Sequence, residues 1–213
     1  MAVASQSVFK ARKTPVQARS TVTVEAIAEA TVQVLLHSGP ERLTTTRVAE
    51  RAGVSVGTLY QYYPNKQSLL FAVLQAHLDK VGAALEEVCR VARNQPLGEM
   101  VQRVVEAFVD AKMERPDISV ALYQIAAGVG GDSLVDRNRR RWQKALEEVL
   151  GTATDASFGD LSFAVRMMIA AMAGTTRAVL EAGASAATVK HLRKHLVVLC
   201  QAYLAAVTDC SVG

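Results

Sequence analysis

The sequence predicts an all-α protein with about nine helices. Alanine, valine and leucine dominate its 213 residues, and residues that favour helices outnumber those that favour strands. Apolar residues recur at spacings of three and four, whereas no alternating apolar and polar run of useful length is present. Glycine and proline separate the periodic segments, which indicates short connections between helices. Since 50% of the residues are hydrophobic, the chain can build a sizeable core.

The first helix follows a basic N-terminal segment. Residues 1–20 contain lysine and arginine but no acid and no apolar periodicity, so we expect a flexible basic arm. The helix is expected from about Val22 to Gly39, which can adopt a left-handed conformation, with Pro40 directly behind it. Its predicted apolar face contains Ile27, Thr31, Val34 and Leu35.

Two short helices joined by a glycine turn come next. The first is expected over residues 45–52, with Thr44 or Thr45 as its N-cap, because a hydroxyl can accept a backbone N–H that has no helical partner. Gly53 supplies the positive φ that a tight turn needs. Ser55 is the candidate cap of the second short helix.

Six longer helices complete the predicted fold after the second short helix ends near Tyr62. Pro64, Pro96 and Pro116 each favour a new helix start, because proline suits the first turn of a helix. Loops rich in glycine precede the last three helices. The expected ranges are 65–93, 96–114, 116–127, 132–150, 160–183 and 186–208.

Residues 45–62 have the spacing of a helix-turn-helix. Ala49 is small where the two helices would cross, and Gly53 lies at the turn between them. In this motif the first helix crosses the DNA backbone, and the N-terminal residues of the second reach base edges in the major groove. Many helical hairpins share a glycine turn; the threonine run and the basic tail around this one favour DNA binding. The apolar residues that would face the first helix are Val48, Ala52, Val54 and Leu59.

The positive charge is concentrated at the same end of the chain. The net charge is +4, and residues 1–66 hold all of the excess, with eight lysines and arginines against four acids. A basic end on a neutral body indicates a region that binds a polyanion, and a merely solvated basic tail is the alternative. By analogy with homeodomain arms, Lys10, Arg12 and Lys13 could enter the minor groove; a plain disordered tail is the other interpretation.

The segment LTTTRVAERAGVSVGTLYQYYPNKQSLL resembles the DNA-binding signature of the TetR (tetracycline-repressor-like) family. The threonine run, the pattern VAxxAGVSxGTLYxYxxxK and the leucine pair carry the resemblance over about residues 24–70, and beyond residue 70 only the number and lengths of the helices agree. The resemblance implies a homodimeric transcriptional regulator, usually a repressor, that leaves its double-stranded DNA operator when a small-molecule effector binds. It implies a DNA-binding domain at 21–66 and a ligand-binding and dimerisation domain at 67–213.

The resemblance also implies which side chains contact DNA. Thr45 would hold a phosphate at a helix N-terminus, where the dipole and free N–H groups favour an anion, and Tyr60 and Lys66 would contact phosphates. Gln61 could pair with adenine, and Val56 could touch a thymine methyl group. The complete predicted set is Thr45, Thr46, Arg47, Ser55, Val56, Gly57, Thr58, Tyr60, Gln61, Tyr62 and Lys66.

The three tyrosines of this segment are expected to divide between core and surface. Tyr63 lies four residues after Leu59 on the same helix face, so it should be buried with Leu59. Tyr60 is rotated by roughly 100° from Leu59, which favours the DNA side. Tyr62 is a candidate at the DNA surface, although it could also pack against the next helix.

The C-terminal body offers candidate contacts for a ligand. Asn138 and Arg139 lie beside Trp142, and a polar pair beside an apolar stripe could orient a ligand in a largely apolar pocket. Core packing, or solvation of Arg139, is the alternative. The apolar face of the helix expected over residues 132–150 contains Val135, Trp142, Leu146 and Val149. The candidate ligand contacts are Phe108, Tyr123, Asn138, Arg139, Trp142 and Met168.

The last two helices are rich in small residues and have a second apolar face. We therefore expect them to pair with their symmetry mates in a four-helix dimer interface. Two-fold symmetry would place two recognition helices one DNA turn apart, roughly 34 Å, on a pseudo-palindrome. His191 and His195 have a spacing that can bind a metal, but no third ligand is evident, so ordinary interface or surface positions are favoured and no cofactor or metal is expected.

Other features limit the class of protein. Cys89, Cys200 and Cys210 are dispersed, which suits a reducing cytoplasm. The sequence contains no run of about 18 uninterrupted apolar residues and no recognisable secretory leader, so we expect neither a membrane span nor secretion. No catalytic arrangement stands out, so we do not expect an enzyme. Two alternatives stay open: a sequence-independent architectural DNA-binding protein, and an all-helical enzyme or metal-binding protein.

Overall fold

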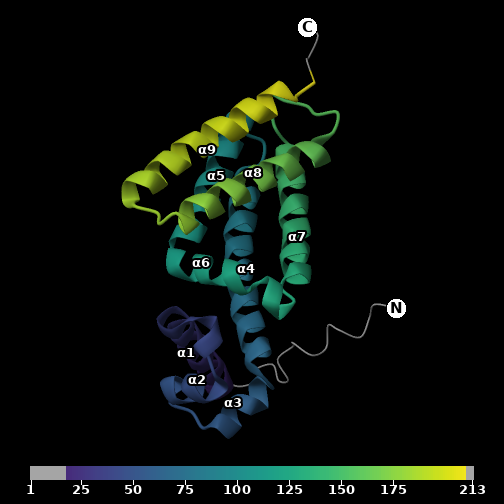
Figure 1. Cartoon of the computed structure of the whole chain (residues 1–213). Coiled ribbons are helices and arrows are strands. Elements are labelled where there is room, and N and C mark those ends of the chain that lie inside the picture. Colours follow the sequence, from purple (N-terminus) through teal and green to yellow (C-terminus); the bar gives the residue numbers. More distant parts are fainter. Residues whose placement is uncertain (1–17, 210–213) are drawn as a thin grey trace, which may run out of the picture. The chain divides into compact units, whose positions relative to one another are not determined.

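The computed structural model of this chain describes residues 18–209, in which nine α-helices and one 3-10 turn form the regular structure (Figure 1). No strand occurs between residues 18 and 209, so the predicted all-α fold is confirmed. Lys10, Arg12 and Lys13 of the predicted arm, and Cys210, lie outside the described residues. The helices are α1 Ala18–Arg42, α2 Thr45–Ala52, α3 Val56–Tyr62, α4 Lys66–Val91, α5 Leu97–Met113, α6 Pro116–Ile125, α7 Asp132–Leu150, α8 Leu161–Glu181 and α9 Ala186–Ala206, and the 3-10 turn is Ala127–Val129.

The observed helices match the predicted ranges within a few residues, and α1 differs most. It begins at Ala18, inside the segment 1–20 that the sequence predicted as an arm. Gly39 has a φ of 75°, in agreement with the predicted positive φ, but α1 then continues through Pro40 to Arg42. Pro40 permits this because it directly follows the break, where its missing N–H is not needed. Gly39 is non-helical, with a ψ of 168°, so the regular part of α1 ends where the sequence predicts, and a short helical turn follows the kink.

The chain divides into two compact units that do not follow a single cut in the sequence. Of the described residues, the first takes 18–77 and 117–134, and the second takes 78–116 and 135–209. Contacts join the two segments of the first unit: the Ser119 hydroxyl lies 3.2 Å from His77 Nε2, and a Cβ on Gly131 would lie 2.6 Å from Leu74 Cδ2. The division at residue 66 into a DNA-binding and a ligand-binding domain concerns function and stays a prediction.

Within the first unit, α1, α2, α3 and the start of α4 contribute to the buried core. Thr31 is buried as well, and its hydroxyl donates to the Ile27 carbonyl at 2.7 Å, which satisfies a polar group inside an apolar environment. The predicted apolar face of the first helix is confirmed by this burial. The buried apolar residues include Ile27, Val34, Leu35, Leu43, Val48, Leu59 and Leu69.

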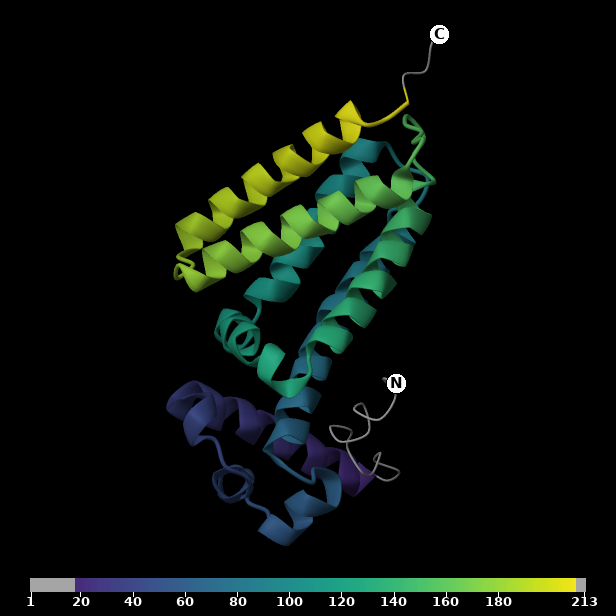
Figure 2. The same ribbon diagram turned by 45° about the vertical axis from the view of Figure 1, so that its right-hand side comes forward.

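Within the second unit, α5, α8 and α9 pack against one another, and α8 and α9 run side by side (Figures 1 and 2). α7 lies along residues 78–91 of α4, where the Arg141 guanidinium donates to the Glu86 carboxylate through Nη2 at 2.6 Å. A Cβ on Gly82 would lie 2.9 Å from Trp142 Nε1, so the missing side chain at Gly82 permits this close approach.

The predicted apolar face of α7 is only partly buried. Trp142, Leu146 and Val149 are in the core, whereas Val135 is 38% exposed. Leu134, one position earlier in the same turn, is 1% exposed, so the buried face of α7 passes through Leu134 and Val135 lies beside it. Its assignment to the apolar face is therefore wrong.

α4 and α8 are long and apolar enough, by composition alone, to cross a membrane. Within the protein, 50% of the most apolar window of α4 and 39% of that of α8 are buried. Core helices of soluble proteins reach the same length and hydropathy, so this finding is weak evidence for a membrane location.

Candidate nucleic-acid interface

α2 and α3 form the two short helices that the sequence predicts, and each has a hydroxyl cap. The Thr44 hydroxyl accepts the backbone N–H of Arg47 at 3.3 Å, so Thr44 rather than Thr45 is the N-cap of α2. The Ser55 hydroxyl accepts the backbone N–H of Thr58 at 3.0 Å and caps α3. Both caps satisfy N–H groups that have no partner within their own helix.

The turn between the two helices depends on Gly53. Its φ of 68° and ψ of 29° are left-handed, and its N–H donates to the Glu50 carbonyl at 3.2 Å. The Val54 N–H donates to the Ala49 carbonyl at 3.0 Å, which completes the usual pattern of a helix that ends at a left-handed glycine. Ala49 is only 1% exposed, as expected for a small residue at a helix crossing.

The three tyrosines have different environments. Tyr63 is 4% exposed and lies in the core with Leu59, which confirms the prediction; burial raises the pKa of its phenol. Tyr60 is 43% exposed and lies on the surface of α3. Tyr62, at the end of α3, is half-buried. The surface of α3 thus presents one tyrosine fully and one in part.

The structure brings together two of the predicted phosphate contacts. The hydroxyl groups of Thr45 on α2 and Tyr60 on α3 are 3.1 Å apart, although the residues are 15 positions apart in sequence. Since either hydroxyl can donate in this pair, the other retains a hydrogen for an outside acceptor. The pair therefore forms a polar point at the surface where the first turn of α2 meets α3.

Lys66 and Arg47 reach toward the end of α1 instead. The Lys66 ammonium donates to the Pro40 carbonyl at 2.7 Å, and the Arg47 guanidinium donates to the Arg42 carbonyl at 3.2 Å. These bonds satisfy carbonyls at the C-terminal end of α1, where cations are favoured. An ammonium has three donors and a guanidinium five, so both side chains keep N–H groups for another acceptor.

The other predicted DNA contacts lie on α2, α3 and the turn before α3. Gly57 and Gln61 are exposed on α3, and a Cβ on Gly57 would meet only the Ser55 hydroxyl at 3.7 Å. The surface of α3 therefore has room for a close approach by another molecule. Thr46 and Ser55 are also exposed, and Val56 and Thr58 are half-buried.

Some of the predicted ligand contacts meet in the core of the second unit. The Phe108 and Trp142 rings are 6.4 Å apart between centroids and inclined by 73°, an edge-to-face arrangement. Met168 is buried in the same unit. Trp142 Nε1 and Thr176 Oγ1 are buried, and neither has a hydrogen-bond partner among residues 18–209. A buried donor without an acceptor is costly, so these two groups are candidates to contact a ligand.

The other predicted ligand contacts differ in burial and in the unit to which they belong. Asn138 is buried, but Arg139 is exposed and forms an ion pair with Asp136 one turn earlier in α7. Tyr123 belongs to the first compact unit, whereas the other candidates belong to the second. His191 and His195 are exposed, and no cluster of three metal-ligating side chains occurs in the part of the chain that the structure describes.

A small cleft lies between α4 and α7. It has a volume of about 310 Å³, and Cys89 on its wall is buried, which raises the pKa of its thiol to about 11. Ion pairs such as Arg93 with Glu148 and Arg141 with Glu86 neutralise much of its charge. The two walls of this cleft are therefore joined by ion pairs.

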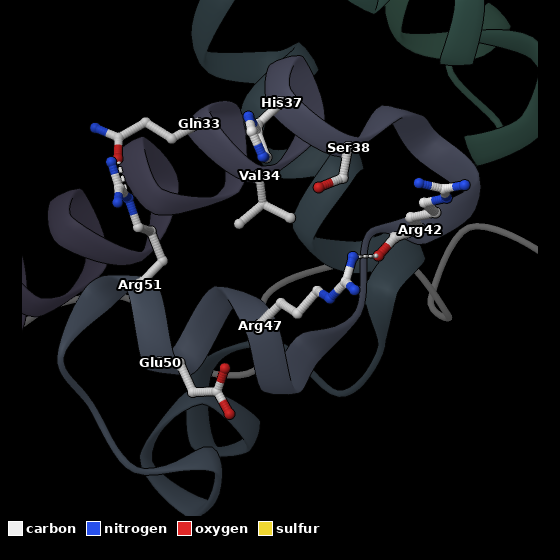
Figure 3. Close-up of a pocket in the computed structure, with 8 residues that line it drawn as sticks. All are labelled: Gln33, Val34, His37, Ser38, Arg42, Arg47, Glu50 and Arg51. Carbon is white, nitrogen blue, oxygen red and sulfur yellow. Dashed lines mark hydrogen bonds between the residues drawn. The ribbon is translucent and has the colours of Figure 1, made fainter.

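Sequence reasoning missed a larger cleft between α1 and α2, within the first unit (Figure 3). Its volume is about 730 Å³. The sequence revealed the positive charge of this end of the chain, but it could not reveal that Arg51 of α2 lies against Gln33 of α1, 18 positions earlier. The lining residues are Gln33, Val34, His37, Ser38, Arg42, Arg47, Glu50 and Arg51.

Two family models match the chain. Residues 27–73 match the model described as bacterial regulatory proteins, tetR family, and residues 96–204 match the model described as tetracyclin repressor-like, C-terminal domain. The first match contains α2 and α3 with their caps. The second covers more than half of the chain, so the similarity is not confined to the short helix-turn-helix.

Curated relatives match over only part of their own length. The transcriptional repressor KstR of Mycolicibacterium smegmatis is 40% identical over 57 residues, which are 27% of this chain and 28% of KstR. The transcriptional activator FasR of the same organism is 32% identical over 78 residues, which are 37% of this chain and 35% of FasR. The chain thus matches about a third of the length of these relatives, and they regulate in opposite directions.

Solved structures resemble the whole fold. A crystal structure from Mesorhizobium loti, described as a TetR-family transcriptional regulator, has a TM-score of 0.73 and 17% sequence identity. The alignment covers 91% of this chain and 100% of that chain. At this identity the likeness supports the fold alone.

Proposed function

This chain belongs to the TetR family of DNA-binding transcriptional regulators, and we propose that it is a cytoplasmic repressor that leaves a palindromic operator when a small molecule binds. Family membership points to a regulator rather than an enzyme. Because the relatives include both a repressor and an activator, repression is part of the proposal. The observation that carries it is the capped pair α2 and α3, with an exposed polar surface on α3.

Some of the proposed DNA contacts would position the protein on the phosphate backbone, and others would recognise the bases. Thr45 and Tyr60, whose hydroxyls are 3.1 Å apart, would bind one backbone phosphate where α2 begins. Gln61 would face base edges in the major groove, and the missing side chain of Gly57 would allow α3 to approach them closely. The remaining contacts proposed from the family resemblance are Thr46, Arg47, Ser55, Val56, Thr58, Tyr62 and Lys66.

The proposed homodimer uses the outer faces of α8 and α9. These helices pack on each other and still expose large apolar side chains, a feature that a soluble monomer rarely gathers on one surface. A second copy would cover them and form a four-helix interface, so that two α3 helices could reach successive major grooves. The exposed apolar side chains on these helices are Phe163, Met167, Val198 and Leu199.

The proposed effector site lies in the second unit around Trp142. Phe108 and Met168 would supply apolar surface, and Trp142 Nε1 and Thr176 Oγ1 would supply polar contacts that the protein itself leaves unsatisfied. A ligand with an acceptor for Trp142 and an apolar body fits this chemistry. Asn138 is a further candidate, while Arg139 has weaker support because it is exposed and forms an ion pair with Asp136. Tyr123 of the first unit stays a candidate from the sequence alone.

In vitro selection of bound duplexes tests the proposal. We expect the selected sequences to share an inverted repeat, and their affinity to fall steeply with salt, because each phosphate contact releases counterions. Small molecules can then be screened for release of the protein from the selected duplex. Equal binding to every duplex would instead favour an architectural DNA-binding protein. Failure to bind any duplex, together with metal retained through His191 and His195, would favour a metal-binding protein.

A further inference from the structure

We propose that the cleft between α1 and α2 binds a phosphate group, carried either by the backbone of DNA or by a free phosphorylated small molecule. The site is separate from the α3 surface. Arg47 is one of the DNA contacts proposed above, whereas the other polar residues named here that line the cleft, Arg42, Arg51, Gln33 and His37, are not. The cleft therefore adds either a second region of DNA contact or a second ligand site to the first compact unit.

The charge of the cleft is the first support. Arg42, Arg47 and Arg51 line it with Glu50 as the sole acid, and none of the three arginines forms an ion pair with a residue in the range 18–209. Elsewhere, arginines such as Arg90 lie against carboxylates. Arg51 lies at one end of the cleft with Gln33, and Arg47 and Arg42 lie at the other (Figure 3), so unpaired guanidinium groups make both ends positive and raise the local affinity for an anion.

The orientation of the arginines is the second support. The Arg47 guanidinium donates to the Arg42 carbonyl at 3.2 Å, and Arg51 Nε donates to Gln33 Oε1 at 2.5 Å. Both acceptors are uncharged, so these bonds hold the guanidinium groups without neutralising them. Figure 3 shows Arg47 and Arg51 extending from α2 toward α1, with the Glu50 carboxylate turned away from them. Pre-oriented guanidinium groups lose less entropy when they bind an anion.

The size and the remaining lining suit a phosphate group. A volume of about 730 Å³ falls within the range of small-molecule sites. His37 and Ser38 add hydrogen-bonding groups from α1, and Val34 provides an apolar wall between them and α2 (Figure 3). A phosphate monoester carries close to two negative charges and three acceptor oxygens. It can therefore accept hydrogen bonds from guanidinium groups, and balance their charge, better than one carboxylate can.

The test uses the full-length protein and changes only the cleft. In the double variant R42Q/R51Q two positive charges are removed while all proposed α3 contacts stay. R51K keeps the charge but loses the planar guanidinium group that donates to Gln33. The matched control is R103Q, which removes an exposed arginine on α5 that has no ion pair among the described residues. Circular dichroism and thermal unfolding identify any variant that fails to fold, and R51K then carries the test.

The first measurement titrates inorganic pyrophosphate into the protein without DNA, by calorimetry at low salt. If a free phosphate compound is the occupant, the wild type and R103Q bind pyrophosphate, and R42Q/R51Q binds at least about tenfold more weakly, as loss of about 1.4 kcal/mol or more produces. R51K should fall between them. This measurement does not depend on the proposed operator, so it can succeed even if the proposed function fails.

The second measurement follows binding of the selected duplex as a function of salt. If the DNA backbone is the occupant, R42Q/R51Q reduces the slope of log K against log salt by about 0.9, the contribution of the one phosphate that the cleft would bind. R103Q leaves the slope unchanged. If no duplex is selected, this second measurement cannot be made, and the result counts against the proposed function. The proposal for the cleft is then tested by pyrophosphate binding.

Two results overturn the proposal. One is that R42Q/R51Q matches R103Q in both measurements, which would make the cleft a solvated gap between helices. The other is that an oligoglutamate peptide binds in a cleft-dependent way while pyrophosphate and DNA do not, which would identify an acidic protein segment as the partner.

Discussion

At the scale of single residues, the chemistry of Tyr60 and Tyr63 is decided by which side of a short helix each occupies. Tyr63 has no exposed surface to offer, and its burial with Leu59 holds α3 in place. Tyr60 is exposed and reaches Thr45 across the helix-turn-helix. The helical period, read from Leu59, predicted this division, because successive residues turn by about 100°.

The Y60F variant tests the proposed phosphate contact. It keeps the ring but removes the hydroxyl that lies 3.1 Å from Thr45 Oγ1. We expect affinity for the selected duplex to fall by about two- to tenfold, which corresponds to about 0.5–1.5 kcal/mol for one hydrogen bond, with thermal stability unchanged. Y203F removes the same group from α9 and serves as control. Equal affinity of Y60F and wild type in gel shifts would count against the contact.

Lys112 of α5 links stability to pH. It is 4% exposed, and burial lowers the pKa of its ammonium from 10.5 to about 8. Below pH 8 the group is charged in both the folded and the unfolded chain, so burial costs on the order of 3 kcal/mol in full. As pH rises toward 10.5, the unfolded chain binds more protons than the folded chain, and stability increases.

The K112M variant isolates this effect. We expect the wild type to gain stability relative to K112M as pH rises from 8 to 10, as measured by urea unfolding. Burial raises the pKa of Cys89 and of Cys200, each to about 11, which lowers stability as pH rises, but this contribution cancels in the difference between the two proteins. A difference that stays constant with pH would show that Lys112 does not titrate in this range.

At the scale of elements, the α2–α3 pair shows why local signals predict helix ends well. Thr44, Gly53 and Ser55 each act within four residues of their partners, so the caps and the turn could be predicted from sequence. The kink of α1 at Gly39 was predicted in the same way, whereas the bond from Lys66, 26 positions later, to the Pro40 carbonyl just beyond it was not. Short-range chemistry was therefore predictable, and contacts between distant segments were not.

The G53A variant tests the turn. Alanine at a φ of 68° places its Cβ against the following carbonyl, so we expect a loss of about 1–2 kcal/mol in the free energy of unfolding. G57A is the matched control, because Gly57 is helical and a Cβ there makes ordinary contact at 3.7 Å. Chemical denaturation should show G57A to be as stable as wild type or more so. Equal stability of G53A and G57A would contradict the argument.

At the scale of the whole molecule, the sequence predicted the fold and the DNA-binding end, whereas it did not predict the contacts between separate helices. The all-α fold and the DNA-binding end could be predicted, since periodicity and the TetR-like motif are both local. The Arg51–Gln33 bond, the unsatisfied Trp142 Nε1 and the arrangement of the cleft could not, because each depends on how separate helices meet. Val135 was misplaced for a related reason: two neighbouring apolar residues open α7, and packing against other helices decided that Leu134 and not Val135 is buried.

The dimer is tested by placing a charge on the outer face of α8 and α9. Leu199 is 47% exposed, and L199E would bury a carboxylate in the proposed interface. We expect analytical ultracentrifugation to detect monomer, and affinity for the selected duplex to fall at least tenfold. V91E makes the same change at the 46% exposed end of α4 and should stay dimeric. A dimeric L199E would place the interface elsewhere.

The return of residues 117–134 to the first compact unit affects how the protein is made. A ribosome releases the DNA-binding helices well before it adds Ser119 and Gly131, which contact His77 and Leu74. Until then the nascent chain holds an incomplete N-terminal core with apolar surface available to chaperones. A stop codon anywhere between residues 78 and 116 would therefore release a fragment that keeps the recognition helix but lacks part of its own support.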